Sequence, residues 1–160
     1  MESNLLNTKA PEFSLEDKDQ KRHSLKSFLG KKVILFFYPK DDTPGCTIES
    51  KSFSTNIEQF DKLNCQVIGI SGGDSVTKTK FCNKYDLKTL MLSDPDFSVS
   101  KNYDAYGEKS FMGKVSNGIS RKTFVVDQDG IIIKIYDKVK VEEHTEEVLD
   151  FIKSTETTAS

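Results

Sequence analysis

The feature that most constrains this chain is an unbroken apolar run at residues 33–38, Val-Ile-Leu-Phe-Phe-Tyr. A run of β-branched and aromatic residues without polar alternation is typical of a strand that is covered on both faces. Pro39 follows the run and ends the strand, because proline cannot donate to a sheet ladder. A second apolar run, at residues 67–70, predicts a neighbouring central strand. The chain is therefore expected to place layers on both sides of a sheet.

Helical segments alternate with these strands. The sequence predicts helices at residues 44–63, 76–85, 98–103 and 144–153, and a further short strand at residues 90–92. In the first helix, apolar side chains recur every three to four residues, which places them on one helix face. For the second helix, Asp74 or Ser75 is the expected N-cap, since their side-chain oxygens can accept from free helical amides.

The C-terminal part of the chain predicts antiparallel strands. Residues 123–126 and 131–136 flank an Asp-Gln-Asp-Gly turn, as in a β-hairpin. Residues 105–120 contain three glycines and are expected to form a long loop. Residues 154–160 are expected to be a disordered tail after a single domain at residues 1–153. The whole pattern predicts an α/β fold, with a central mixed β-sheet flanked by helices.

Composition excludes several classes of protein. In 160 residues, no apolar run approaches the ~18 residues of a membrane-spanning helix. The 23 basic and 25 acidic residues give a formal charge of −2. The chain therefore lacks the excess of positive charge that binding to nucleic acid or an anionic membrane requires. The N-terminus shows no secretory signal. The three cysteines are an odd, low count, which favours a reducing, cytoplasmic location over a disulfide scaffold.

Cys46 is the candidate reactive group among these cysteines. Cys46, Cys65 and Cys82 are too widely spaced for a structural zinc site. Cys46 falls in the first turn of a predicted helix, where free amides and the helix dipole lower a thiol pKa and favour the nucleophilic thiolate. A small buried hydrophobe is the alternative for this position. Thr43 either caps the helix or also serves the sulfur.

The segment Pro39-Lys40-Asp41-Asp42-Thr43-Pro44-Gly45-Cys46 fits the peroxiredoxin active-site pattern P-x-x-x-[ST]-x-x-C. Three further blocks look like the Q-type branch of that family, the bacterioferritin comigratory proteins. They are Ala10-Pro11-Glu12-Phe13, Leu92-Ser93-Asp94 and Gly107-Glu108-Lys109-Ser110-Phe111-Met112-Gly113-Lys114. The resemblance covers the chain from Ala10 to Lys153, and it implies a thioredoxin-like fold with no metal or organic cofactor.

The resemblance also implies roles for individual residues. Cys46 attacks the O–O bond of hydrogen peroxide or an organic hydroperoxide and becomes a sulfenic acid. Thr43 hydrogen-bonds the reacting oxygens, and Pro39 shields the site from water or only bends the chain. Arg121, just before a predicted strand, stabilises thiolate and peroxide with its planar, permanently charged guanidinium; the alternative is a surface salt bridge. Glu49, one turn after Cys46, either orients Arg121 or is a solvated carboxylate.

A second cysteine is implied as the group that resolves the sulfenic acid. Many Q-type members carry it five residues after the first, where this chain has Lys51. Others carry it about 36 residues downstream, where this chain has Cys82. The expected step is an intramolecular Cys46–Cys82 disulfide, reduced by thioredoxin or a similar dithiol, in a monomeric protein. The alternative for Cys82 is a packed core thiol, and Cys65 is expected to be buried and structural.

Other functions fit the same residues. A redox sensor or holdase would use Cys46 without catalytic turnover, and a one-cysteine peroxidase would leave Cys82 structural. Disulfide exchange of the thioredoxin kind is disfavoured, because Thr43-Pro44-Gly45-Cys46 contains one cysteine where that reaction expects two.

Overall fold

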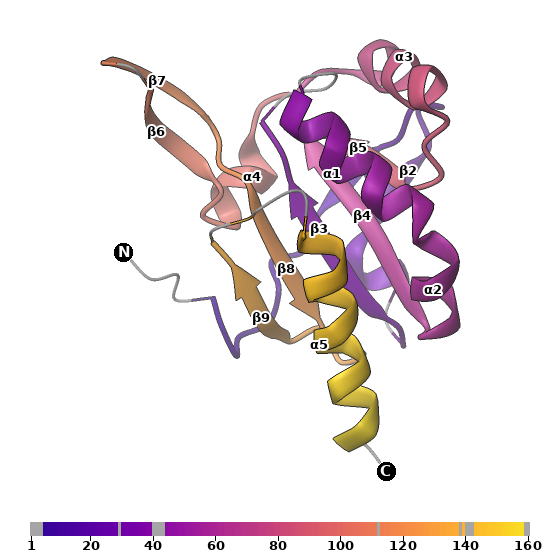
Figure 1. The fold of residues 1–160 in the computed structure, drawn as a ribbon. Coiled ribbons are helices and arrows are strands. Elements are labelled where there is room, and N and C mark those ends of the chain that lie inside the picture. The colour runs from indigo at the N-terminus through magenta and orange to yellow at the C-terminus, as the bar shows by residue number, and fades with distance from the viewer. Residues whose placement is uncertain are drawn as a thin grey trace.

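A seven-stranded mixed sheet forms the centre of the molecule, in the order β2-β1-β5-β4-β3-β8-β9 (Figure 1). Its strands are β1 (Ser14–Glu16), β2 (Arg22–Ser24), β3 (Lys32–Phe37), β4 (Cys65–Ser71), β5 (Leu90–Ser93), β8 (Lys122–Val126) and β9 (Ile132–Tyr136). β3, β4 and β5 are parallel, since helices cross over between them, whereas β8 and β9 are antiparallel. The α/β fold with a central mixed sheet is confirmed.

Helices cover both faces of this sheet in the computed structural model. One face packs against α1 (Pro44–Thr55), α2 (Ile57–Lys62), α3 (Ser75–Tyr85) and α5 (His144–Thr158). The other packs against α4 (Ser98–Asn102) and the short 3-10 helix η1 (Leu25–Phe28). The structure describes residues 5–28, 30–39, 44–111, 113–137, 139 and 143–158, with only the backbone described at 44–46, 109–111, 114, 116 and 155–158. No helix in these ranges is long and apolar enough to cross a bilayer.

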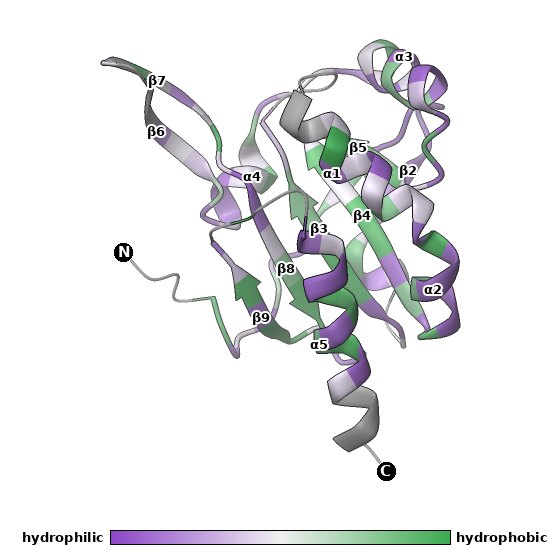
Figure 2. Cartoon of the chain, in the orientation of Figure 1, coloured by the Kyte–Doolittle hydropathy of each residue, from purple (hydrophilic) through white to green (hydrophobic). Residues whose placement is uncertain are grey.

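The interior strand β3 explains why two helical layers are needed. All six of its residues are buried; five of them belong to the apolar run, whereas the burial of Lys32 is not predicted by that pattern. Ile34 and Phe36 point into the core beneath α1 and α5, whereas Leu35 and Phe37 point into the core that contains α4. Figure 2 shows long hydrophobic stretches along the central strands. Each face of β3 thus has its own apolar cluster.

The expected long loop at residues 105–120 is wrong. This segment forms a two-stranded antiparallel ribbon, β6 (Tyr106–Phe111) and β7 (Lys114–Ile119), that extends away from the central sheet (Figure 1). Two of its glycines, Gly107 and Gly118, pair across the strands, and Gly113 turns the chain with a φ of 80°. The ribbon's composition is polar and rich in glycine, so it lacks the apolar alternation from which a strand is recognised.

Two predicted helices have different bounds. The expected helix at 44–63 is interrupted at Asn56, which separates α1 from α2. The Asn56 side chain donates to the carbonyl of Ser52, and such local bonding competes with helix continuation. The last helix continues to Thr158, beyond Lys153, because no glycine or proline marks an earlier end. The N-cap of α3 is as expected: Asp74 accepts from the amide of Thr77 in a capping box.

The N-terminal segment lies along the outer edge of β9. The amide of Asn7 donates to the carbonyl of Ile132, and the amide of Ile132 donates to the carbonyl of Thr8. A β-bridge joins Lys9 and Ile131. The edge of the hairpin that was expected at residues 123–136 is therefore covered by residues 7–9.

Gly69 makes the close packing above β4 possible. A Cβ at this position would lie 2.6 Å from Phe36 Cζ and 2.9 Å from Met91 Sδ. The Phe36 ring in turn stacks on Phe53 of α1, with a centroid separation of 4.7 Å. The absent side chain at Gly69 therefore lets Phe36 lie across the sheet and support α1.

We expect Gly69→Ala to reduce the free energy of unfolding by about 1–3 kcal/mol, because overpacking displaces Phe36 and Met91. Urea denaturation measures this change. Gly107→Ala is the matched control, since a Cβ there meets no atom within 4 Å. Equal stability of the Gly69→Ala and Gly107→Ala proteins would contradict the packing argument.

Candidate active site

The pairing of β8 with β3 brings two distant segments of the chain to the carboxyl end of β3. Lys122 is in register with Phe37, the last residue of β3, so Arg121 lies beside the carboxyl end of that strand. The chain then enters α1, of which Cys46 is the third residue. Arg121 therefore lies at the end of β3 from which the chain continues to α1, although the two are far apart in sequence.

The segment between β3 and α1 carries the remaining predicted site residues. Pro39 is half-buried and forms a bend after β3, which agrees with its expected role in ending the strand. Thr43 lies outside the described residues. Cys46 lies in the first turn of α1, as the sequence predicts, and its side chain is outside the description. Its backbone position is among the free amides of a helix N-terminus.

Glu49 and Arg121 form a buried ion pair next to this turn. Arg121 Nη1 donates to Glu49 Oε1 at 3.0 Å. The Glu49 side chain is fully buried, whereas 22% of the Arg121 side chain is exposed. Glu49 is therefore no solvated carboxylate: it holds a guanidinium one helical turn after Cys46. Its second oxygen, Oε2, is buried and has no hydrogen-bond partner among the described residues.

The environment of Glu49 changes its acidity. Burial raises the pKa of Glu49 to about 7, because water no longer solvates the carboxylate. The positive charge of Arg121 and its hydrogen bond oppose this shift only in part. The pair therefore joins a permanent cation to an acid that changes charge close to neutral pH.

The other two cysteines are buried in the core under the helices. Cys82 lies on α3 in the cluster that includes Tyr38 and Phe81. Cys65 begins β4, and its thiol donates to the carbonyl of Leu63, as expected for a structural cysteine. In the described part of the chain, no three His, Cys, Asp or Glu residues gather in a group that could hold a metal ion.

A groove of about 350 Å³ lies between the C-terminal half of α1, the start of α2 and the end of α3. Its lining includes Lys51 and Ser54 from α1 and Tyr85 from α3. The Lys51 ammonium lies 5.6 Å from the centroid of the Tyr85 ring. Lys51 therefore connects α1 to the end of α3.

Two buried polar residues near the site were missed by the sequence analysis. Lys78 is fully buried on α3; its ammonium donates to the carbonyl of Gly72 at 2.7 Å and lies 5.7 Å from the centroid of the Tyr38 ring. His144 is buried at the start of α5, where its Nε2 is 2.7 Å from Thr123 Oγ1. A lysine or histidine in a polar stretch gives no sign of burial, so no local signal could have found either residue.

The comparisons with known proteins agree with this geometry. The sequence matches the AhpC/TSA family over residues 6–135. The chain belongs to the AhpC/TSA family. Within it, a putative peroxiredoxin Bcp from Helicobacter pylori is 42% identical over 141 residues, which are 88% of this chain and 93% of that protein. Peroxiredoxin Bcp from Escherichia coli is 39% identical over 144 residues, which are 90% and 92% of the two proteins.

Solved structures place this member of the family in the same branch. Peroxiredoxin Q from Xanthomonas campestris superposes with a TM-score of 0.84 at 32% identity, covering 89% of this chain and 90% of that one. The predicted thioredoxin-like fold and the resemblance to Q-type peroxiredoxins are thereby confirmed. The chain is a peroxidase of the peroxiredoxin kind, an oxidoreductase that takes electrons from thiols.

Replacing Glu49 by Gln removes the titration of the buried acid. The pKa of Glu49 is raised in the folded protein, so its protonated form stabilises the fold. This contribution to the free energy of unfolding is fully present below pH 4.5 and is lost as the pH rises through about 7. The quantity to compare is the free energy of unfolding of the unchanged protein minus that of Glu49→Gln. This difference should decrease by up to about 3 kcal/mol when the pH is raised from about 5 to about 8.

Urea titrations at the two pH values measure this difference. Glu58→Gln, at an exposed position of α2, is the matched control. Its free energy of unfolding should differ from that of the unchanged protein by the same amount at both pH values. A Glu49→Gln difference that does not change with pH would contradict the raised pKa.

Proposed function

We propose that this peroxidase reduces hydrogen peroxide and organic hydroperoxides through a sulfenic acid on Cys46, which Cys82 then resolves as an intramolecular disulfide. The observation that carries the proposal is the Glu49–Arg121 pair at the end of β3, one turn from Cys46. The pair holds a guanidinium beside the helix N-terminus in which the reactive cysteine lies. A cation at that place favours the thiolate over the thiol.

The first step moves one oxygen from peroxide to sulfur. The Cys46 thiolate attacks the outer peroxide oxygen, the O–O bond breaks, and its electron pair leaves with the second oxygen as hydroxide or alkoxide, which takes up a proton. Arg121 and Thr43 donate hydrogen bonds to the reacting oxygens in this proposal, and Pro39 keeps water away. Charge that develops on the leaving oxygen is stabilised by the fixed guanidinium.

The second step joins two sulfurs. The Cys82 thiolate attacks the sulfenic sulfur, the S–O bond breaks, and the oxygen leaves as water after protonation. Supporting this assignment, two solved Xanthomonas campestris peroxiredoxin Q variants have a single cysteine replaced by serine, at positions that are 36 residues apart. Cys46 and Cys82 have the same separation.

Cys82 must leave the core for this step. Its thiol is buried beside Phe81, which packs on Tyr38 with ring centroids 6.1 Å apart. A disulfide needs Cα atoms within about 7 Å, and Cys46 and Cys82 lie on two separate helices, of which α3 keeps Cys82 packed in the core. We therefore expect the ends of α1, α3 or both to unwind during resolution.

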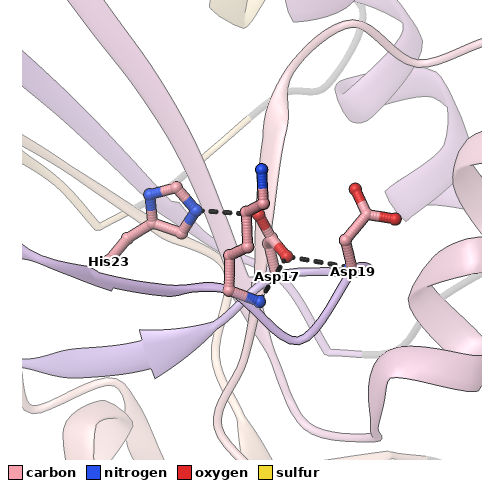
Figure 3. A network of polar contacts seen from close by, with 4 residues as sticks. Asp17, Asp19 and His23 are labelled. Carbon is pink, nitrogen blue, oxygen red and sulfur yellow. Dashed lines mark hydrogen bonds and ion pairs between the residues drawn. The ribbon is translucent and has the colours of Figure 1, made fainter.

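The turn between β1 and β2 lies against the first turns of α3. Asp17 organises this turn by accepting from the amides of Asp19 and Lys21 and pairing with His23 (Figure 3). Thr79 Oγ1 on α3 lies 3.2 Å from the carbonyl of Lys18, although its hydrogen goes to the nearer carbonyl of Ser75 at 2.7 Å. These contacts must loosen when α3 unwinds, so they favour the form in which Cys82 is buried.

The cycle closes when an external dithiol reduces the disulfide. We assign this role to thioredoxin or a similar protein in a reducing, cytoplasmic compartment, and we expect the enzyme to be a monomer with no role for nucleic acid or membrane. An organic hydroperoxide as substrate is supported by the bacterioferritin comigratory protein of Xanthomonas campestris, whose ligand complexes are described for alkyl peroxide reduction.

Peptide mapping tests the pair of sulfurs. One equivalent of hydrogen peroxide followed by thiol alkylation should give a Cys46–Cys82 disulfide in the unchanged protein. Cys82→Ser should still consume one equivalent but stall with thioredoxin, whereas Cys65→Ser, the matched control, should turn over normally. Full thioredoxin-dependent cycling of Cys82→Ser would make the enzyme a one-cysteine peroxidase, and oxidation of Cys46 without any turnover would favour a sensor.

Arg121→Lys tests the guanidinium. It keeps the positive charge but loses the planar fork of donors, so the second-order rate of Cys46 oxidation should fall on the order of 100-fold. The chain contains one other arginine, Arg22, whose exposed side chain donates to the carbonyl of Ser14. Arg22→Lys is therefore the matched control, and rapid mixing with peroxide should show an unchanged rate for it. A normal rate in Arg121→Lys would remove Arg121 from the reaction.

A further inference from the structure

His144 is a buried polar residue that the proposed reaction does not use. It begins α5 and is 1% exposed. Both ring nitrogens are engaged: Nε2 lies 2.7 Å from Thr123 Oγ1, and Nδ1 lies 3.1 Å from Glu147 Oε1. The ring also packs edge-on against Phe53 and Tyr136, with centroids 5.8 and 5.0 Å apart. Its position is therefore fixed from four directions.

The hydrogen bonds determine which nitrogen carries the proton. A carboxylate only accepts hydrogen bonds, so Nδ1 must donate to Glu147. In the neutral ring Nε2 then carries no hydrogen and accepts from the hydroxyl of Thr123. Protonation would place a hydrogen on Nε2, and the Thr123 hydroxyl would have to turn its own hydrogen elsewhere in a fully buried site. The arrangement is complete only with a neutral ring.

The contacts of His144 lead to both members of the ion pair. Thr123 follows Arg121 by two residues at the start of β8. Phe53 follows Glu49 by four residues, which is one turn along the same face of α1. His144 therefore contacts the strand behind Arg121 and the helix that carries Glu49, and it joins both to α5.

The charged groups around His144 oppose one another. Arg121 lies just before β8 and its charge acts on the ring, Glu49 on α1 is the partner of Arg121, Glu147 approaches from α5, and Tyr136 packs from β9. Burial lowers the pKa of His144, and the Arg121 charge lowers it further, while Glu147 acts in the opposite direction. The ring is thus neutral near neutral pH, and a proton taken up in acid would place a second cation near Arg121.

We propose that His144 is a positioning residue for peroxide reduction: as a neutral ring it fixes Thr123 and Phe53, and through them the Arg121–Glu49 pair, and its protonation slows the reaction in acid. The inference rests on the role proposed for Arg121. Thr123 and Glu147 act with His144, since they hold its two nitrogens.

The test is the second-order rate of Cys46 oxidation by hydrogen peroxide as a function of pH. His144→Gln should be slower on the order of ten- to a hundredfold near neutral pH, because the pair is displaced from its working position. The rate of the unchanged protein divided by that of His144→Gln should approach one as the pH falls below 6.5, the ordinary pKa of histidine. The reason is that a protonated ring no longer holds the Arg121–Glu49 pair in position. A purely structural role would give a ratio that does not change with pH.

Companion variants keep the proposal falsifiable if His144→Gln folds poorly. Thr123→Val removes the partner of Nε2 and should reproduce the pH-dependent loss. Glu147→Gln removes the carboxylate that favours the charged ring. The loss of rate in acid should therefore begin at a lower pH in this variant. His23→Gln changes the chain's other histidine, which pairs with Asp17, and should leave the rate ratio at one.

Proton NMR provides an independent measurement. With two histidines in the chain, His23→Gln leaves the His144 ring signals alone in their spectral region. The midpoint of their titration should coincide with the midpoint of the rate ratio. A pH-independent ratio in both His144→Gln and Thr123→Val would overturn the role of His144 alone, whereas normal oxidation of Arg121→Lys would show that the underlying role of Arg121 has failed.

Discussion

The antiparallel pairing of β8 with β3 is the constraint on which the site depends. β3 is buried on both faces, so it stays at the centre of the sheet, and its carboxyl end determines where α1 begins. Lys122 opposite Phe37 then brings Arg121 to that same end. A shift of β8 by one residue would point Arg121 and Thr123 to the opposite face. The register therefore fixes both the guanidinium and the packing around α5.

Burial makes the Glu49–Arg121 pair both costly and specific. Two charges taken out of water lose much of their solvation, and the ion pair restores only part of it. Removing either partner would leave the other uncompensated, so the two side chains hold each other in one geometry. Arg121 keeps contact with solvent, whereas Glu49 has none. The buried carboxylate of Glu49 is therefore unfavourable for stability. It fixes the orientation of the Arg121 guanidinium near the helix that contains Cys46.

Local pattern was sufficient for the parts of the fold that are apolar. The strand at 33–38 and the cap at Asp74 follow from periodicity and side-chain chemistry, and Cys46 could be placed at a helix start for the same reasons. Arg121 was assigned through the family motif, since nothing local distinguishes it from a surface residue. The ribbon of β6 and β7 and the burial of His144 depend on contacts between distant segments, which the surrounding sequence does not record.

The strip formed by residues 7–9 has a consequence for how copies of the protein meet. An open edge of a sheet is a template on which a second chain can add a strand. Here the outer amide and carbonyl of Ile132 are already engaged by Asn7 and Thr8, and Lys9 bridges to Ile131. The opposite edge strand, β2, has three residues. Addition of a strand beside Ile131 and Ile132 would first have to displace the protein's own N-terminal segment.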